Sequence, residues 1–131
     1  MTGVEPSPRP RRARLSRSGD FDAVYRRGKS ASSRHLVVYA FRREDAGPDD
    51  LARLGVSVSR KVGGAVERNR IKRVLREQFA VLAAELPRGM DFVAIARPGT
   101  FEYIEEQGGG VLGERLGELA RKAAGIGAPT A

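Results

Sequence analysis

Apolar residues recur at two different spacings along the chain, and the spacing separates the expected strands from the expected helices. β-Branched and aromatic side chains are concentrated in residues 34–41, which predicts a strand. In residues 53–59, large apolar residues alternate with glycine and serine, so a second strand is expected to have one apolar face and one small, polar face. Residues 91–96 are mostly apolar and predict a third main strand.

The segments before, between and after these strands have apolar residues at helical spacing and are expected to form helices. A long helix is expected over residues 65–85, because its apolar residues form one continuous stripe that must lie on the sheet. The stripe consists of Ile71, Val74, Leu75, Phe79 and Leu82. A short first helix is expected to start near residue 18 and to end before Gly28. A last helical segment should begin with Thr100 as its N-cap, and the glycines at 108–110 leave the structure of its middle open.

The order helix, strand, strand, helix, strand, helix predicts an α+β two-layer sandwich, in which helices pack on a mixed sheet of about four strands. A chain of 131 residues provides one domain, which we expect at residues 15–123. Residues 1–14 contain three prolines and four arginines and are expected to form a disordered basic arm, while residues 124–131 are expected to be a flexible tail. A cytoplasmic protein is expected, since the sequence has neither the roughly 18 apolar residues of a membrane span nor a stretch resembling a signal peptide.

The amino-acid composition limits the partners and the catalytic chemistry that the protein can have. Lys and Arg number 24 against 16 Asp and Glu, a net charge of +8, which indicates an anionic partner such as nucleic acid or a membrane surface. The absence of cysteine excludes disulfides and thiolate chemistry. The single histidine, His35, is expected in a strand, and no nucleophile motif, phosphate-binding loop or suitable pair of carboxylates accompanies it. No catalytic side chain and no metal site on the protein are therefore expected.

Positive charge is concentrated at the start of the expected long helix and in the turn before it. Residues 60–76 hold seven basic residues and one acid, Glu67, a local net charge of +6. Asn69, Lys72, Arg73 and Arg76 follow at helical spacing and share one face beside the apolar stripe. Cations in the first helical turn oppose the helix dipole, which favours a phosphate-binding surface over an ordinary solvated face.

Aromatic residues make up only 6% of the chain, which makes their positions informative. Phe21 and Tyr25 share a face of the expected first helix, and Tyr39 lies on the first expected strand. From the residues alone, packing in the core and stacking on unpaired bases are equally good interpretations of these side chains.

Residues 55–77, GVSVSRKVGGAVERNRIKRVLRE, resemble the signature of the bacterial ribonuclease P protein subunit. The resemblance covers roughly residues 14–122 and extends to Phe21, Val24, Tyr25 and Gly28 upstream and to Arg97 downstream. It implies a fold like domain 2 of ribosomal protein S5, with a left-handed crossover between parallel strands against the usual right-handed rule. It also implies an endoribonuclease in which the RNA subunit, using Mg²⁺, removes the 5′ leader of precursor tRNA, while the protein supplies no catalytic residue.

The same resemblance implies roles for individual residues. Those expected to face the RNA subunit are Arg60, Lys61, Arg68, Asn69, Arg70, Lys72, Arg73 and Arg76. Those expected to line a cleft for the single-stranded leader are Phe21, Tyr25, Val37, Tyr39, Ser57 and Ser59. The implied partners are the RNA subunit and precursor tRNA, with no membrane and no further protein required.

Two other functions remain open. A ribosomal or general RNA-binding protein without a role in cleavage fits the charge and the fold class equally well. A nuclease that acts without RNA is the third possibility, and it predicts cleavage by the purified protein alone.

Overall fold

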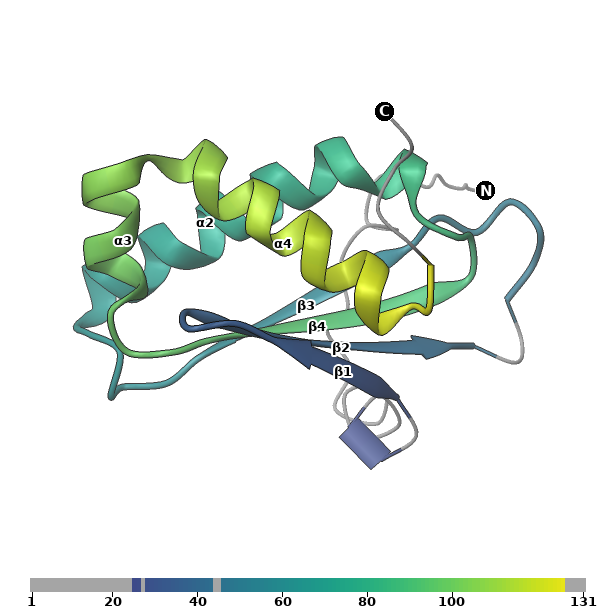
Figure 1. Ribbon diagram of the computed structural model, residues 1–131, viewed down its shortest axis with the longest axis horizontal. Coiled ribbons are helices and arrows are strands. Elements are labelled where there is room, and N and C mark those ends of the chain that lie inside the picture. Colours follow the sequence, from purple (N-terminus) through teal and green to yellow (C-terminus); the bar gives the residue numbers. More distant parts are fainter. Residues whose placement is uncertain (1–24, 27, 44–45, 127–131) are drawn as a thin grey trace, which may run out of the picture.

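The computed structural model describes residues 25–26, 28–43 and 46–126, in which helices cover one face of a four-stranded sheet (Figure 1). The predicted α+β two-layer sandwich is therefore confirmed. The strands are β1 (Lys29–Ser32), β2 (Leu36–Arg42), β3 (Arg53–Val58) and β4 (Met90–Ala96). The helical elements are α2 (Ala65–Leu82), the 3-10 helix η2 (Ala83–Glu85), α3 (Thr100–Gln107) and α4 (Gly109–Ala123).

The sheet has the strand order β1-β2-β4-β3, so β1 and β3 form its edges. β2 pairs antiparallel with both β1 and β4, whereas β3 and β4 are parallel. In Figure 1 both parallel strands run toward α3, with β3 behind β4 and α2 above them, so the β3–α2–β4 crossover is left-handed. This rare connection, which the resemblance implied, places α2 over the β3 edge of the sheet.

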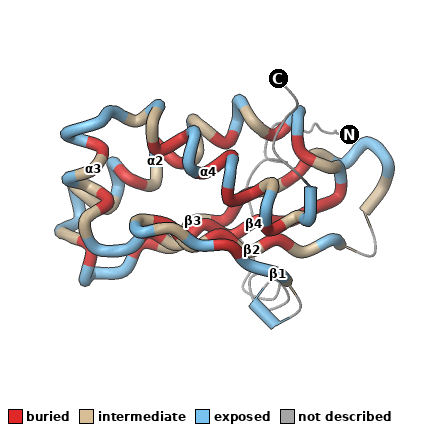
Figure 2. The backbone as a smooth tube through the Cα atoms, viewed as in Figure 1, coloured by how far each residue is buried: buried red, intermediate tan, exposed pale blue. Residues whose placement is uncertain are grey.

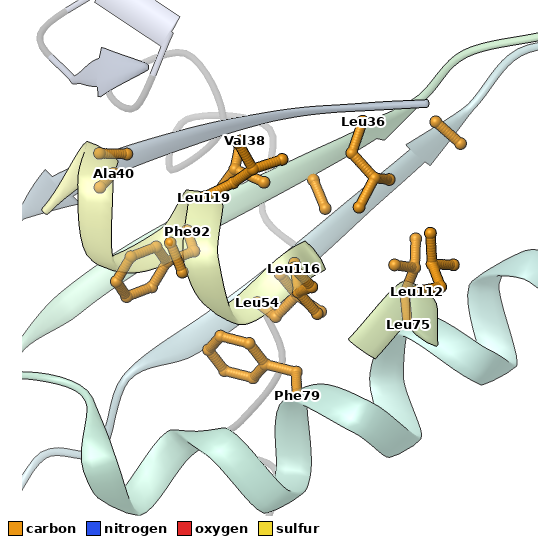
Figure 3. Close-up of a cluster of buried hydrophobic side chains, with 14 of the residues drawn as sticks. Leu36, Val38, Ala40, Leu54, Leu75, Phe79, Phe92, Leu112, Leu116 and Leu119 are labelled. Carbon is orange, nitrogen blue, oxygen red and sulfur yellow. The ribbon is translucent and has the colours of Figure 1, made fainter. Parts of the chain in front are cut away.

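One apolar core fills the space between the sheet and the helices, where buried segments of both layers face each other (Figure 2). The apolar stripe of α2 reaches it as predicted, and Phe79 packs on Phe92 of β4 with ring centroids 5.8 Å apart. α4 covers the other half of the sheet, over β1 and β2, with Leu112, Leu116 and Leu119 pointing at the strands (Figure 3). The long helix expected at 65–85 is thus confirmed as α2 followed by η2.

Several local expectations need correction. Thr100 is the first residue of α3 rather than its N-cap; the cap is Gly99, with φ of 98°, and the Thr100 hydroxyl lies 3.0 Å from the His35 carbonyl oxygen. His35 lies one residue before β2, not within a strand. β1 was not expected as a separate strand, because only Ala31 of its four residues is buried.

The last helical segment is two helices, because Gly108 interrupts it with a φ of 92°. The glycines that follow have a packing role. A β-carbon on Gly109 would lie 3.1 Å from Val74, and one on Gly113 would lie 2.8 Å from Cγ of Gln78. Small residues therefore let α4 pack closely against one flank of α2.

A buried ion cluster fixes the end of the sheet where β2 finishes and β3 and β4 begin. Asp91 is 1% exposed and accepts two hydrogen bonds of 2.8 Å from Arg53. Nε of Arg43 lies 3.1 Å from the same carboxylate. Arg43 also lies 3.8 Å from Asp50, so the charges of this cluster cancel one another and the excess positive charge of the chain lies elsewhere.

Parts of the chain named in the sequence analysis lie outside the described residues. They include the basic arm at 1–14, Phe21 and Val24, and residues 127–131 of the expected tail. The expected first helix is described only at Tyr25 and Arg26, which are helical. None of the described helices is both long and apolar enough to cross a membrane.

Candidate nucleic-acid interface

The one acid within the basic stretch, Glu67, folds back on the preceding loop and caps the start of α2. Oε1 of Glu67 accepts a hydrogen bond of 2.6 Å from the Gly64 amide, one of the amides that a helix start leaves unpaired. A β-carbon on Gly63 would lie only 2.6 Å from the same oxygen, so a larger residue there would displace the capping carboxylate. Nε of Arg68 donates to the Gly63 carbonyl at 3.1 Å. Glu67 therefore holds the loop and the helix together.

The two flanks of α2 have different neighbours. The flank with Val74 and Gln78 lies against the glycines of α4. The opposite flank, with Arg68, Lys72 and Arg76 at i, i+4 and i+8, consequently faces away from α4, toward the outer edge of β3. We call this flank, together with the exposed residues Asn69 and Arg73 beside it, the basic flank.

Two groups of predicted RNA-facing residues lie apart from the basic flank. Arg60 and Lys61 are exposed in the loop between β3 and α2, just before the helix begins. Arg70 lies on the other side of the helix, and its Nε is 3.4 Å from a carboxylate oxygen of Glu105 on α3. Both of these side chains are about half exposed, at 44% and 51%. The structure thus separates Arg70 from the other basic residues of the signature.

The sheet face opposite the helices carries most of the predicted cleft residues. Register places Tyr39, Val93 and Gly55 side by side in one row across β2, β4 and β3. The next row contains Val37, Ile95 and Ser57. Val93 is fully buried beneath Tyr39, Phe41 and Ile95, so the face has an apolar floor that ends in small residues at β3. We call this surface the open face.

Tyr25 spans the open face from β2 to β3. Its ring meets that of Tyr39 edge to face, with centroids 5.3 Å apart, and its hydroxyl is hydrogen-bonded to Ser57. Burial raises the pKa of the Tyr25 phenol, the hydrogen bond with Ser57 lowers it, and the neighbouring Tyr39 raises it again, with a net rise. The phenol therefore stays protonated at neutral pH. Tyr25 is still 39% exposed, so it remains accessible to a ligand.

The basic flank and the open face meet at one structural element. β3 is an edge strand, with α2 above it on the helical side and Ser57 on the open side. Ser59, the last predicted cleft residue, is exposed directly after β3 and precedes Arg60. The two sets of predicted residues therefore form neighbouring surfaces on either side of the β3 edge.

The described residues contain no cluster of three or more His, Asp or Glu side chains that could hold a metal ion. His35 is engaged in packing, because its ring stacks on Tyr103 with centroids 4.3 Å apart. Burial lowers the pKa of His35, and the nearby Arg34 and Arg115 lower it further. At neutral pH this imidazole is uncharged.

The family model described as Ribonuclease P matches residues 10–112. The chain belongs to the ribonuclease P protein family. A ribonuclease P protein component from Brevibacillus brevis is 43% identical over 97 residues, which cover 71% of this chain and 75% of that protein.

Solved ribonuclease P protein structures share the fold. The protein from Thermotoga maritima is 32% identical, with a TM-score of 0.72 over 83% of this chain and 96% of that one. A Staphylococcus aureus ribonuclease P protein mutant, described as defective in mRNA degradation activity, is 33% identical, with a TM-score of 0.70 over 87% of this chain and 89% of that one. Family membership confirms the role predicted from the sequence, that of a ribonuclease P protein subunit in tRNA 5′-leader processing.

Sequence reasoning missed two features of this interface. Val93 and Ile95 form the floor of the open face, although the uninterrupted apolar run of residues 92–96 could have indicated that β4 is covered on both faces. The partner of Arg70 was also missed, because Glu105 is 35 positions away and nothing local connects them.

Proposed function

We propose that the chain binds the RNA subunit of ribonuclease P through the basic flank and the Arg60–Lys61 loop, and the single-stranded 5′ leader of precursor tRNA across the open face. The observation that carries this proposal is that the basic flank, which contains no acid, borders an accessible aromatic sheet face at the β3 edge. One surface suits the phosphates of a folded RNA, and the other suits unpaired bases.

The protein contributes position and electrostatics. Lys and Arg side chains that neutralise phosphates release bound counterions, so affinity falls as salt rises. By offsetting phosphate repulsion, the basic flank lowers the Mg²⁺ concentration at which the RNA subunit is active. The Mg²⁺ ions are held by the RNA, and the RNA breaks the phosphodiester bond, with no protein side chain touching the reacting atoms. The reaction takes place in the cytoplasm and needs no further protein.

The open face gives the complex its preference for precursor over mature tRNA. Stacking of an unpaired base on an aromatic side chain stabilises the complex by about 1–3 kcal/mol per base, largely independently of the base sequence. Tyr25 and Tyr39 offer such a surface, and Ser57 and Gly55 leave space beside it. Because mature tRNA lacks the leader, only the precursor gains this contribution.

Reconstitution with the cognate RNA subunit tests the proposal. The holoenzyme should remove the leader at a Mg²⁺ concentration at which the RNA alone is slow, and it should bind precursor tRNA with a leader of several nucleotides more tightly than mature tRNA. Equal affinities for precursor and mature tRNA would favour the alternative, a general RNA-binding protein. Failure of the protein to bind the RNA subunit would refute the proposal outright.

A nuclease activity of the protein itself is a second candidate, favoured by one observation: the Staphylococcus aureus relative is described in terms of mRNA degradation. The purified protein, treated with ribonuclease to remove any copurifying RNA and then repurified, should be incubated with precursor tRNA and with an unstructured mRNA fragment. We expect no cleavage of either substrate, and cleavage by the RNA-free protein would establish the second candidate.

A further inference from the structure

One aromatic side chain, Tyr25, is held on the open face at two points. Its ring meets that of Tyr39 on β2 at an angle of 83°, with centroids 5.3 Å apart. Its hydroxyl is hydrogen-bonded to Ser57 on β3, and β4 lies between these two strands. The ring is therefore fixed across the middle of the sheet rather than at a single strand.

Ser57 is the residue of β3 that is able to hold this hydroxyl. Side chains alternate between the two faces of a strand, and those of β3 that point away from the core are Arg53, Gly55 and Ser57. The Arg53 guanidinium donates two hydrogen bonds of 2.8 Å to Asp91. Gly55 has no side chain. The serine hydroxyl is thus the group of this strand that is left to bond Tyr25.

A base that crosses the open face meets the Tyr25 ring rather than the serine beside it. Tyr25 is 39% exposed, whereas Ser57 is less exposed and its hydroxyl is already bonded. The floor at Val93 is fully buried. The accessible group for stacking is consequently the aromatic ring, and Ser57 acts on a base through the position of that ring.

We propose that Ser57 is a positioning residue, whose hydrogen bond holds the Tyr25 ring in the orientation in which a base of the leader stacks on it. The inference rests on the proposed function, because it assumes that the leader crosses the open face. Without the bond, the ring turns about its side-chain torsions in the free protein and has to be ordered when the leader binds. That ordering lowers the affinity for the leader.

A double-mutant cycle in the reconstituted holoenzyme tests the inference with Ser57→Ala, Tyr25→Phe and the combined variant. Tyr25→Phe keeps the ring and removes only the hydroxyl. The quantity measured is the ratio of affinities for precursor tRNA, with a leader of several nucleotides, and for mature tRNA. Each single variant should lower this ratio about two- to tenfold, the cost of ordering one side chain on binding. The combined variant should lose no more than either single variant, because both break the same bond.

Two further variants separate the hydrogen bond from other effects of the substitution. Ser32→Ala is the matched control, because Ser32 lies in the same row of the open face as Ser57, at the opposite edge of the sheet, and is exposed. It should keep the wild-type ratio. Ser57→Thr keeps the hydroxyl on a side chain that strands accept, so it should restore most of the preference for precursor.

The phenol of Tyr25 gives a readout that a packing role of Ser57 leaves unchanged. The chain has three tyrosines, so Tyr39→Phe/Tyr103→Phe makes Tyr25 the only phenol that titrates. The hydrogen bond with Ser57 lowers the pKa of Tyr25, so Ser57→Ala in this background should raise that pKa further in an absorbance titration. Ser57→Thr should return it to the value of the background.

An unchanged affinity ratio in Ser57→Ala would overturn the inference, as would an equal loss in Ser32→Ala. Additive losses in the combined variant would show that Ser57 contacts the leader itself. Tighter binding of precursor by Ser57→Ala would show that the bond keeps the ring in the path of the leader. All of these results leave the proposed function standing, because the wild-type holoenzyme would still prefer precursor; if it does not, the proposed function fails first.

Discussion

Removing two charges from the basic flank should weaken RNA binding without disturbing the fold. Lys72 is half-buried and Arg73 is exposed, and the apolar stripe of α2 contains neither. No carboxylate among the described residues forms an ion pair with either side chain. Replacing both with alanine therefore leaves no buried charge unpaired, and the free energy of unfolding should change by less than about 0.5 kcal/mol for each.

The expected loss of binding follows from counterion release. Two phosphate contacts contribute about 1.4–1.8 to the salt slope, which corresponds to an affinity about 15- to 30-fold lower at about 0.15 M salt. The assay is titration of the RNA subunit with Lys72→Ala/Arg73→Ala at several salt concentrations, together with leader removal at several Mg²⁺ concentrations. The double variant should need more Mg²⁺ to reach the same cleavage rate.

A variant with the same net charge controls for long-range electrostatics. Arg88→Ala/Lys122→Ala also removes two exposed cations, but from the far end of the sheet and the last turn of α4. We expect it to keep nearly the wild-type slope. The reasoning would be refuted if Lys72→Ala/Arg73→Ala retained the wild-type slope, or if both double variants lost equal affinity.

Three further predictions concern packing, a competing ion pair and pH. Gly89→Ala should lower the free energy of unfolding by about 1–3 kcal/mol, because Gly89 has a φ of 78° and the added carbon would lie 2.8 Å from the β-carbon of Ala46, whereas Gly110→Ala, which has open space around it, should be neutral or stabilising in thermal unfolding. Glu105→Gln should raise affinity for the RNA subunit a few-fold at low salt, because it frees Arg70; unchanged affinity would show that Arg70 does not reach RNA. Because the pKa of His35 is lowered in the folded state, the unfolded chain binds a proton at this residue more readily. The stabilising contribution of neutral His35 is therefore complete above about pH 6.5 and is lost as the pH falls through the lower pKa of the folded state. His35→Gln should flatten this part of the stability profile, and an unchanged profile would contradict the assignment.

The sequence predicted those parts of the fold that are recorded in local periodicity. The apolar stripe of α2 and the β-branched residues of β2, β3 and β4 each identify an element without reference to the rest of the chain. β1 has no comparable pattern, because its edge position buries a single alanine. The position of the break between α3 and α4 could not be predicted either, because three consecutive glycines do not indicate which one adopts a positive φ.

The candidate site, like the fold, could be predicted only where a local sequence pattern records it. The signature located the basic residues, and helical spacing placed Lys72, Arg73 and Arg76 together. Spacing could not show that Arg70 would meet Glu105, nor that Glu67 would accept a hydrogen bond from the Gly64 amide, because both depend on tertiary packing and loop conformation. The bridge from Tyr25 to Ser57 depends on strand register across three strands, which no local pattern specifies.

Mapping the path of the leader tests the central claim most directly. Precursor tRNA with 4-thiouridine in its leader, bound to the reconstituted holoenzyme and irradiated, should crosslink to the open face, and mass spectrometry should recover peptides of β2 and β3 that contain Tyr39 and Ser57. A matched substrate with the label in the tRNA body should not crosslink there. Leader crosslinks confined to α3 and α4, or a leader that crosslinks only to RNA, would contradict the account.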